Sequence, residues 1–318
     1  MDWRFRRSVR VNKSRRRVTV INRHTLAAPV VCAGIGLHSG ERVRMVMQPA
    51  SAGAGISFVR TDISDIDNRI PAKADAVCEL RLGTTIGNAA GATIATIEHL
   101  MAALSGLGVD DAVIEVDGSE IPVMDGSSAP FVKLIRQVGL KAHAVPRRAI
   151  QVLKPVTVEM DERRASFLPA LKPMIEVEIA FEHAAVGRQA CVFDVTPDIF
   201  SDDIAGARTF GFQKDYDALL AAGLARGGSM DNAVVLDDEG VANPEGLRFK
   251  DEFVRHKALD ALGDLSLAGA PIIGRYSAER PGHAINNLAL RALLDDPTSW
   301  KWINMRDDAR QDVALAHS

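Results

Sequence analysis

The sequence predicts an α+β protein with two domains. Its 318 residues suffice for two domains of about 150 residues each, a usual domain size. Segments in which apolar and polar residues alternate come first, and segments with apolar residues at helical spacing follow. The same order occurs again further along the chain, which indicates two units of similar build.

The first domain is expected over residues 23–145. Gly and Pro break residues 28–60 into short strands, and apolar residues alternate with polar ones over 41–48, which predicts an antiparallel sheet. The elements that follow are a helix from the N-cap residue Thr96 to Ser105, a strand over 112–116 and a helix over 129–138.

Residues 141–148 contain Pro146 and show no periodic pattern, so they are the predicted linker. The second domain is expected over residues 149–300, and residues 301–318 are expected to form a C-terminal tail. The predicted elements of the second domain are strands over 150–160 and 175–181 and helices over 215–224, 251–267 and 284–294.

Composition is that of an ordinary globular protein, with 47% hydrophobic and 25% charged residues. No apolar run approaches the roughly 18 residues of a membrane-spanning helix, and the N-terminus lacks the apolar segment of a secretory signal. Cys32, Cys78 and Cys191 are widely spaced and form no C-x-x-C pair, which argues against disulfides and cysteine zinc sites. We therefore expect a cytoplasmic protein with reduced thiols, and the lack of a coiled-coil pattern favours a monomer.

Residues 1–22 form a basic arm. Residues 1–24 hold nine Lys and Arg but a single acidic residue, Asp2. The favoured interpretation is a solvated, disordered tail or an upstream translation start, because only Trp3 and Phe5 supply aromatic rings. Peripheral contact with anionic lipid through the arm is the alternative. We expect no nucleic-acid partner.

The stretch from His256 to Asp264 carries the strongest chemical signal. On a helix, a spacing of four places the imidazole of His256 and the carboxylate of Asp260 on one face. Such a pair is also common on solvated helix faces, so a third ligand is needed. His99 is the candidate. Two imidazoles and one carboxylate would hold one zinc ion with a coordination position open, at the interface between the two domains.

Glu98 and His283 are the candidate base and acid. Glu98 precedes His99 in the predicted first turn of a helix, where the helix dipole favours an ionised carboxylate. His283 begins another helix, so it needs an anionic partner to stay protonated near neutral pH. Asp264 is the candidate partner, four residues after Asp260 and on nearly the same face. Charge compensation by Glu98 and helix capping by His283 are the structural alternatives.

Three more residues have candidate roles. Thr209 could lend its hydroxyl to an oxyanion, although a Thr between Arg and Phe is usually strand material. Lys257 and Arg280 could meet a phosphate, although surface lysines and arginines seldom have such a role. Their roles therefore depend on the motifs found elsewhere in the chain.

Taken together, the motifs of this sequence resemble those of the zinc-dependent UDP-3-O-acyl-N-acetylglucosamine deacetylases, which catalyse the committed step of lipid A synthesis in Gram-negative bacteria. The resemblance covers nearly the whole chain, and its motifs occur in the order of that family. In chain order, the motifs lie at 23–26, 36–40, 98–100, 120–127, 207–212, 246–249, 253–265 and 282–287.

The resemblance implies two domains whose helices pack face to face, with zinc between them. It assigns the metal to His99, His256 and Asp260, the base to Glu98, and the acid to His283 with Asp264 behind it. It further implies that Thr209 stabilises the oxyanion and that Lys257 and Arg280 face the nucleotide diphosphate. An inserted segment over about 210–229 would form the acyl passage, with an apolar face made of Phe210, Tyr216, Leu219, Leu220 and Leu224.

The implied reaction is hydrolysis of the N-acetyl group of UDP-3-O-(3-hydroxyacyl)-N-acetylglucosamine, which yields acetate and a free 2-amino sugar. A catalytically silent binding protein for acylated nucleotide sugars is the main alternative, but pure binding would not need Glu98, His283 and Asp264. An adaptor acting through the basic arm is a second alternative. A zinc peptidase is a third, disfavoured because the sequence lacks H-E-x-x-H.

Overall fold

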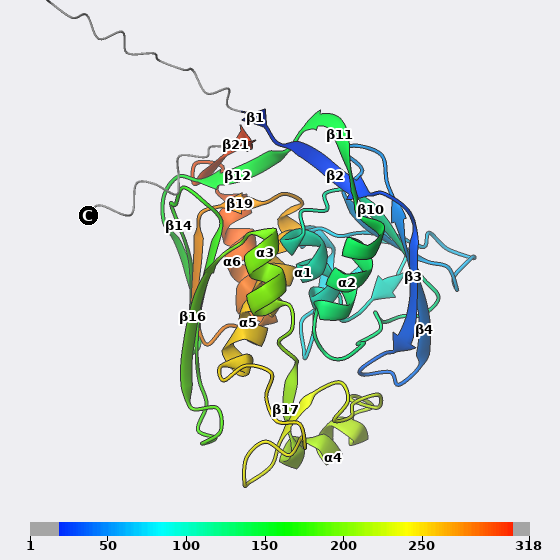
Figure 1. Cartoon of the computed structure of the whole chain (residues 1–318), viewed down its shortest axis with the longest axis vertical. Coiled ribbons are helices and arrows are strands. Elements are labelled where there is room, and N and C mark those ends of the chain that lie inside the picture. Colours follow the sequence, from blue (N-terminus) through cyan, green and yellow to red (C-terminus); the bar gives the residue numbers. More distant parts are fainter. Residues whose placement is uncertain (1–18, 308–318) are drawn as a thin grey trace, which may run out of the picture.

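The computed structural model of the chain describes residues 19–307 and contains two five-stranded sheets with helices between them. One sheet lies on each side of the molecule in Figure 1, and α1, α2, α5 and α6 fill the space between them. The predicted α+β class, with helices of the two halves packed face to face, is confirmed.

The first sheet has the order β3-β4-β10-β5-β6, in which β10 and β5 are parallel and the other neighbours antiparallel. The expected antiparallel sheet is therefore correct except for this one pair. Helices α1 and α2 belong to the same half. The bounds are β3 Val30–Ile35, β4 Arg42–Pro49, β5 Ile56–Arg60, β6 Arg69–Pro71, α1 Glu98–Gly106, β10 Ala112–Val116 and α2 Ala129–Val138.

The second sheet has the order β13-β14-β20-β15-β16 and repeats the first in topology. Again the central strand is parallel to one neighbour, β15, and antiparallel to the other. Helix α5 stands in the place of α1, and α6 in the place of α2. The bounds are β13 Val156–Met160, β14 Arg163–Leu168, β15 Met174–Ala180, β16 Arg188–Asp194, α5 Glu252–Leu265, β20 Arg275–Glu279 and α6 His283–Asp295.

Smaller elements close the ends of the two halves and form the segment that projects at the bottom of Figure 1, which contains β17, β18 and α4. The small-sheet strands are β1 Thr19–Val20, β2 Asn22–Leu26, β7 Val77–Glu79, β8 Thr85–Gly87, β9 Thr93–Ile94, β11 Leu140–Pro146, β12 Arg148–Val152, β17 Phe210–Phe212, β18 Val234–Leu236, β19 Ile272–Ile273, β21 Trp300–Asn304 and β22 Arg306–Asp307. The remaining helices are η1 Ala74–Ala76, α3 Pro197–Ile199, the π-helical η2 Phe200–Ile204, α4 Gln213–Ala221 and η3 Ser266–Ala268.

Local sequence patterns predicted several elements well. The strand over 112–116 and the helix over 129–138 have their predicted bounds, and the last two predicted helices end within two residues of α5 and α6. The prediction that Thr96 caps α1 is wrong. The N-cap residue of α1 is Ile97. The Thr96 hydroxyl donates instead to the buried carboxylate of Glu120, 3.0 Å away.

Two segments without a clear pattern form strands. The predicted linker over 141–148 lies largely in β11, which pairs with β2 near the start of the described chain. Its side chains are mostly exposed, so no periodic pattern marked it. Residues 301–307 of the predicted tail form most of β21 and all of β22, paired with β12 and β1. The domain boundaries at 23–145 and 149–300 stay a prediction.

Residues 1–18 of the predicted basic arm and residues 308–318 lie outside the described residues. Within residues 19–307, no helix has both the length and the apolar character that crossing a membrane would require.

Helices α1 and α5 meet at a glycine. A Cβ atom built on Gly263 of α5 would lie 2.1 Å from the backbone oxygen of Glu98, the first residue of α1. Backbone atoms cannot swing away as a flexible side chain can. Gly263 therefore permits a separation between the two helices that any larger residue would prevent.

We expect Gly263→Ala to destabilise the protein. Alanine is favoured over glycine inside a helix by about 1 kcal/mol, so an uncrowded site would gain stability. Overpacking costs about 1 to 3 kcal/mol, and a clash with backbone belongs at the upper end of that range. After the gain in helix propensity is subtracted, the net loss of unfolding free energy should be about 1 to 2 kcal/mol, measured by urea unfolding. Gly211→Ala is the control, because no heavy atom lies within 4 Å of its Cβ position. A Gly263→Ala protein as stable as the wild type would contradict the proposed packing constraint.

Candidate metal centre and active site

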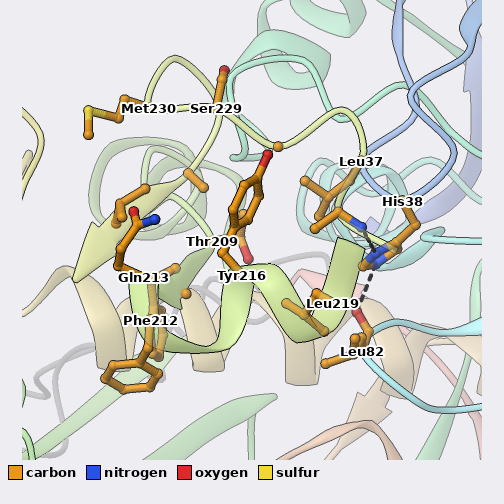
Figure 2. Close-up of a pocket in the computed structure, with 16 residues that line it drawn as sticks. Leu37, His38, Leu82, Thr209, Phe212, Gln213, Tyr216, Leu219, Ser229 and Met230 are labelled. Atoms are coloured by element: carbon orange, nitrogen blue, oxygen red, sulfur yellow. Dashed lines mark hydrogen bonds between the residues drawn. The ribbon is translucent and has the colours of Figure 1, made fainter. Parts of the chain in front are cut away.

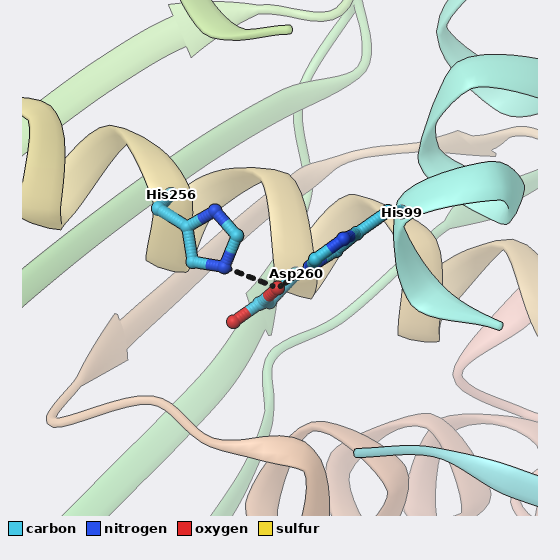
Figure 3. Close-up of side chains that lie close together, drawn as sticks. All are labelled: His99, His256 and Asp260. Carbon is cyan, nitrogen blue, oxygen red and sulfur yellow. Dashed lines mark ion pairs between the residues drawn. The ribbon is translucent and has the colours of Figure 1, made fainter. Parts of the chain in front are cut away.

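Three side chains from α1 and α5 converge between the two halves. His99 lies in the first turn of α1, and His256 and Asp260 lie one turn apart on α5 (Figure 3). One ligand atom from each residue lies within 4.8 Å of the other two, and all three residues are buried. The Asp260 Oδ1 atom is 3.3 Å from His256 Nε2 and 3.6 Å from His99 Nε2. The structure thus brings together the residues predicted as metal ligands.

The chemistry of these three side chains fits a divalent cation such as zinc. The Nδ1 atom of His256 donates to the Ala207 carbonyl oxygen at 3.0 Å, which leaves the lone pair of Nε2 free to bind. Burial lowers the pKa of His256 to about 3, so the imidazole is neutral. Burial alone would raise the pKa of Asp260, but His256 and Lys257 outweigh it and hold that pKa well below its usual range. Two imidazoles and a carboxylate are available as ligands.

Glu98 borders this cluster and is 3% exposed. Its Oε2 atom accepts the backbone N–H of Thr84 at 3.0 Å, and its Oε1 atom lies 3.9 Å from His283 Nε2. Burial raises the pKa of Glu98, although His283 opposes the shift. A carboxylate whose pKa is raised towards neutrality is suited to accept a proton.

His283 begins α6 and lies against Asp264 of α5. The Nδ1 atom donates to Asp264 Oδ2 at 2.9 Å. Burial disfavours the charged imidazolium, but the carboxylates of Asp264 and Glu98 outweigh it and raise the pKa of His283 to about 10. His283 therefore holds a proton at neutral pH, beside the carboxylates of Asp264 and Glu98.

Lys257 and Arg280 border a second polar region. The Lys257 ammonium lies 2.9 Å from Asp260 Oδ2 and 5.6 Å from the centre of the Phe210 ring. Arg280 pairs with Glu162. Together with Arg163, both line a cavity of about 420 Å³ whose other lining residues are Asp161, Glu162, Ile179, Ala180, Phe181 and Pro281.

Thr209 lines a largely apolar cavity of about 310 Å³ (Figure 2). Of the residues predicted for an acyl passage, Phe210, Tyr216 and Leu219 line the cavity, and Tyr216 and Leu219 project from α4. Leu220 and Leu224 are not among the lining residues, and Leu220 is 38% exposed. The opposite wall comes from Leu37, His38 and Leu82 of the first half. Leu37 and His38 lie in the motif at 36–40, but the sequence predicted no role for any of the three residues.

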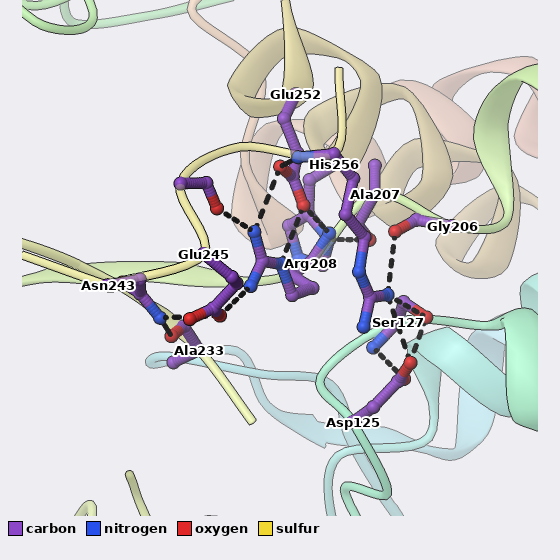
Figure 4. A network of polar contacts seen from close by, with 12 residues as sticks. Asp125, Ser127, Gly206, Ala207, Arg208, Ala233, Asn243, Glu245, Glu252 and His256 are labelled. Carbon is purple, nitrogen blue, oxygen red and sulfur yellow. Dashed lines mark hydrogen bonds and ion pairs between the residues drawn. The ribbon is translucent and has the colours of Figure 1, made fainter. Parts of the chain in front are cut away.

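Arg208 lies in the motif at 207–212, but its burial and its ion pairs were not predicted from the sequence. It lies between Ala207, which orients His256, and Thr209, and it is 2% exposed. Its Nε atom donates to Glu252 at 2.9 Å, and its other nitrogens reach Glu245 and the Gly246 carbonyl (Figure 4). Glu252 lies in the first turn of α5 and is fully buried. This ion pair ties the segment carrying Ala207 and Thr209 to the helix that carries two candidate ligands.

Comparisons with known proteins give one consistent result. Residues 23–295 match the sequence profile of the family described as UDP-3-O-acyl N-acetylglycosamine deacetylase. The chain is similar to the UDP-3-O-acyl-N-acetylglucosamine deacetylase of Phenylobacterium zucineum, with 50% identity over 91% of this chain and 99% of the relative. Proteins of the same name from Shewanella frigidimarina and Vibrio parahaemolyticus are 46% and 44% identical, over 94% and 93% of this chain and 100% and 98% of their own lengths.

We expect Glu252→Ala to cost about 3 to 5 kcal/mol of unfolding free energy, because it leaves the guanidinium of Arg208 buried with half of its anionic partners removed. The matched control is Glu245→Gln, which removes the other partner of Arg208. The Glu245 side chain is 55% exposed, so solvent screens the ion pair and its replacement should cost far less than that of Glu252. Urea unfolding of the two variants measures the difference. Equal losses would show that burial of this ion pair does not decide its contribution.

Proposed function

We propose that this chain, which belongs to the UDP-3-O-acyl N-acetylglycosamine deacetylase family, hydrolyses the N-acetyl group of a UDP-3-O-acyl-N-acetylglucosamine. The products are acetate and a free 2-amino sugar, and the reaction is a step of lipid A biosynthesis. The observation that carries this proposal is the convergence of His99, His256 and Asp260 beside Glu98 and His283.

We propose zinc as the metal, held by His99, His256 and Asp260, with one ion per chain. When bound, zinc supplies Lewis acidity, which polarises a carbonyl group and makes water more acidic. The buried position and the neutral imidazole of His256 support this assignment. The remaining steps depend on side chains of this chain.

In the proposed reaction, Glu98 takes the proton of the attacking water. Its buried carboxylate, with a raised pKa, favours this transfer near neutral pH. His283 carries its proton on Nε2, since Nδ1 is bound to Asp264, and gives it to the departing amine nitrogen. The 3.9 Å between Glu98 Oε1 and His283 Nε2 supports base and acid acting on one reacting centre.

The two cavities support a division of the substrate. The diphosphate would lie in the cavity lined by Lys257, Arg280 and Arg163, because these three cations outnumber the two carboxylates of the lining, Asp161 and Glu162, and so favour an anion. The acyl chain would lie in the apolar cavity, against Phe210, Tyr216 and Leu219. Thr209, which lines that cavity, would donate its hydroxyl to the oxyanion. Leu220 and Leu224 lie outside the lining and are not included in the proposed acyl contact.

We further propose that the protein acts in the cytoplasm as a monomer; contact between its basic arm and anionic lipid is the alternative that the sequence left open. Three free cysteines support a reducing compartment. Burial raises the pKa of Cys32 to about 11 and that of Cys191 to about 12, which keeps both thiols protonated and unreactive.

We expect Glu98→Gln and His283→Ala each to lower kcat for acetate release by about 10²- to 10⁴-fold, the usual share of general acid–base catalysis. Zinc content should stay at one ion per chain in both, because neither residue is a proposed ligand. His99→Ala should lose both zinc and activity. Glu159→Gln is the control, because this side chain is 71% exposed on the outer part of β13. Near-normal turnover in both Glu98→Gln and His283→Ala would refute the assigned roles.

The pH dependence of kcat/KM should be bell-shaped. Activity should fall at low pH as Glu98 becomes protonated and at high pH as His283 loses its proton. Because the carboxylate of Asp264 helps to raise the pKa of His283 to about 10, Asp264→Asn should move the alkaline limb to lower pH. The measurement is kcat/KM for both proteins across the range in which they remain folded. An alkaline limb that stays in place in Asp264→Asn would mean that another group donates the proton.

A further inference from the structure

Thr84 contacts the proposed base, Glu98, and the carboxylate beside the proposed acid, Asp264, although none of the assignments above includes it. It directly precedes β8 in the first half of the chain and is 1% exposed. Its backbone N–H donates to Glu98 Oε2 at 3.0 Å, and its hydroxyl donates to Asp264 Oδ1 at 2.6 Å. One residue therefore touches both the proposed base, Glu98, and the carboxylate that binds the proposed acid, Asp264.

The Thr84 hydroxyl completes a set of contacts that fixes the Asp264 carboxylate. The Oδ2 atom of Asp264 accepts from His283 Nδ1 at 2.9 Å and from Asn286 Nδ2 at 2.8 Å. The Asn286 amide is held in turn by the Tyr276 hydroxyl, which donates to its Oδ1 atom at 2.7 Å. All of these partners belong to the second half of the chain. Among the described residues, the hydroxyl of Thr84 is the hydrogen-bond donor from the first half.

The contact with Thr84 is the side-chain hydrogen bond that satisfies the Oδ1 atom of Asp264. Asp264 is 3% exposed, so water does not replace a missing partner at Oδ1. Without the hydroxyl, the carboxylate can rotate about its last bond to seek another donor. Rotation would move Oδ2 away from His283 Nδ1 and leave the imidazole without a fixed direction.

The loop that carries Thr84 has a strained backbone conformation. Leu82 has a φ of 63°, in the left-handed region that residues with a side chain rarely adopt. Gly83 follows, and a Cβ atom there would lie 3.1 Å from Glu98 Oε1. Strained backbone of this kind persists where surrounding contacts hold it, and it concentrates near functional sites. Here those contacts bring Thr84 against Glu98 and Asp264.

We propose that Thr84 is a positioning residue of the deacetylation reaction: its hydroxyl orients Asp264 towards His283 while its amide holds Glu98. Base and acid are then aligned only when the loop before β8 is docked against α1 and α5. This inference rests on the proposed function.

Thr84→Val tests the hydroxyl alone, because valine has nearly the same shape and keeps the backbone N–H that Glu98 accepts. We expect kcat for acetate release to fall about ten-fold or more, as for other residues that orient an active group through hydrogen bonds. The KM should change by less than about two-fold, and zinc content should not change. Thr84→Ser, which retains the hydroxyl, should restore kcat to within about three-fold of the wild type. Thr93→Val, at an exposed threonine of β9 in the same small sheet, is the matched control.

A double-mutant cycle separates positioning from a general loss of structure. If Thr84 acts through Asp264, then adding Thr84→Val to Asp264→Asn should lower kcat by less than about two-fold further. Independent, structural damage would instead multiply the two effects. Full activity of Thr84→Val, failure of Thr84→Ser to rescue, or multiplicative effects would each overturn the inference while the proposed function stands. A wild-type protein that binds zinc but releases no acetate would overturn the proposed function, and this inference with it.

Discussion

The close approach of α1 and α5 is the constraint on which the candidate site depends. Metal ligands spaced 157 residues apart in the sequence meet because the backbone of Glu98 lies directly against Gly263. At this separation His99 reaches the face of α5 that carries His256 and Asp260, and Glu98 reaches His283. A wider gap, even of about one methyl group, would move all of these contacts together, since the side chains involved are short and buried.

Buried charges are stabilised by charges of opposite sign, and in this cluster the negative charges outnumber the positive ones. Glu98, Asp260 and Asp264 contribute three carboxylates, whereas Lys257 and His283 contribute two cations. An excess of negative charge inside a protein is costly unless a cation or a proton balances it. A bound divalent cation would balance it at Asp260, and the raised pKa of Glu98 is consistent with a carboxylate that gains from taking up a proton. Metal binding at Asp260 and proton uptake by Glu98 would therefore both reduce the excess negative charge of the cluster.

Sequence patterns predicted what depends on neighbouring residues and missed what depends on distant ones. The spacing of His256 and Asp260 fixes their common face whatever the rest of the fold does, and the bounds of β10 and α2 follow from local periodicity. Thr96 was misassigned because its partner, Glu120, lies 24 residues away. Thr84 and Asp264 are separated by 180 residues, so no local pattern could pair them. The same reason explains why the strand character of β11 and the burial of Arg208 went unpredicted.

The duplicated topology suggests why the site is built from connections as well as from helices. In each half, the connection between the last strand before the helix and the helix itself carries extra elements: β7, β8 and β9 before α1, and β17, α4 and β18 before α5. Because α1 and α5 occupy equivalent places and pack together, the two connections emerge at the same helix pair. Leu82 comes from the first connection and Thr209 from the second, and both line the apolar cavity. Repeating one module thus gives a rigid pair of helices, while the different connections supply the cavities that a substrate would need.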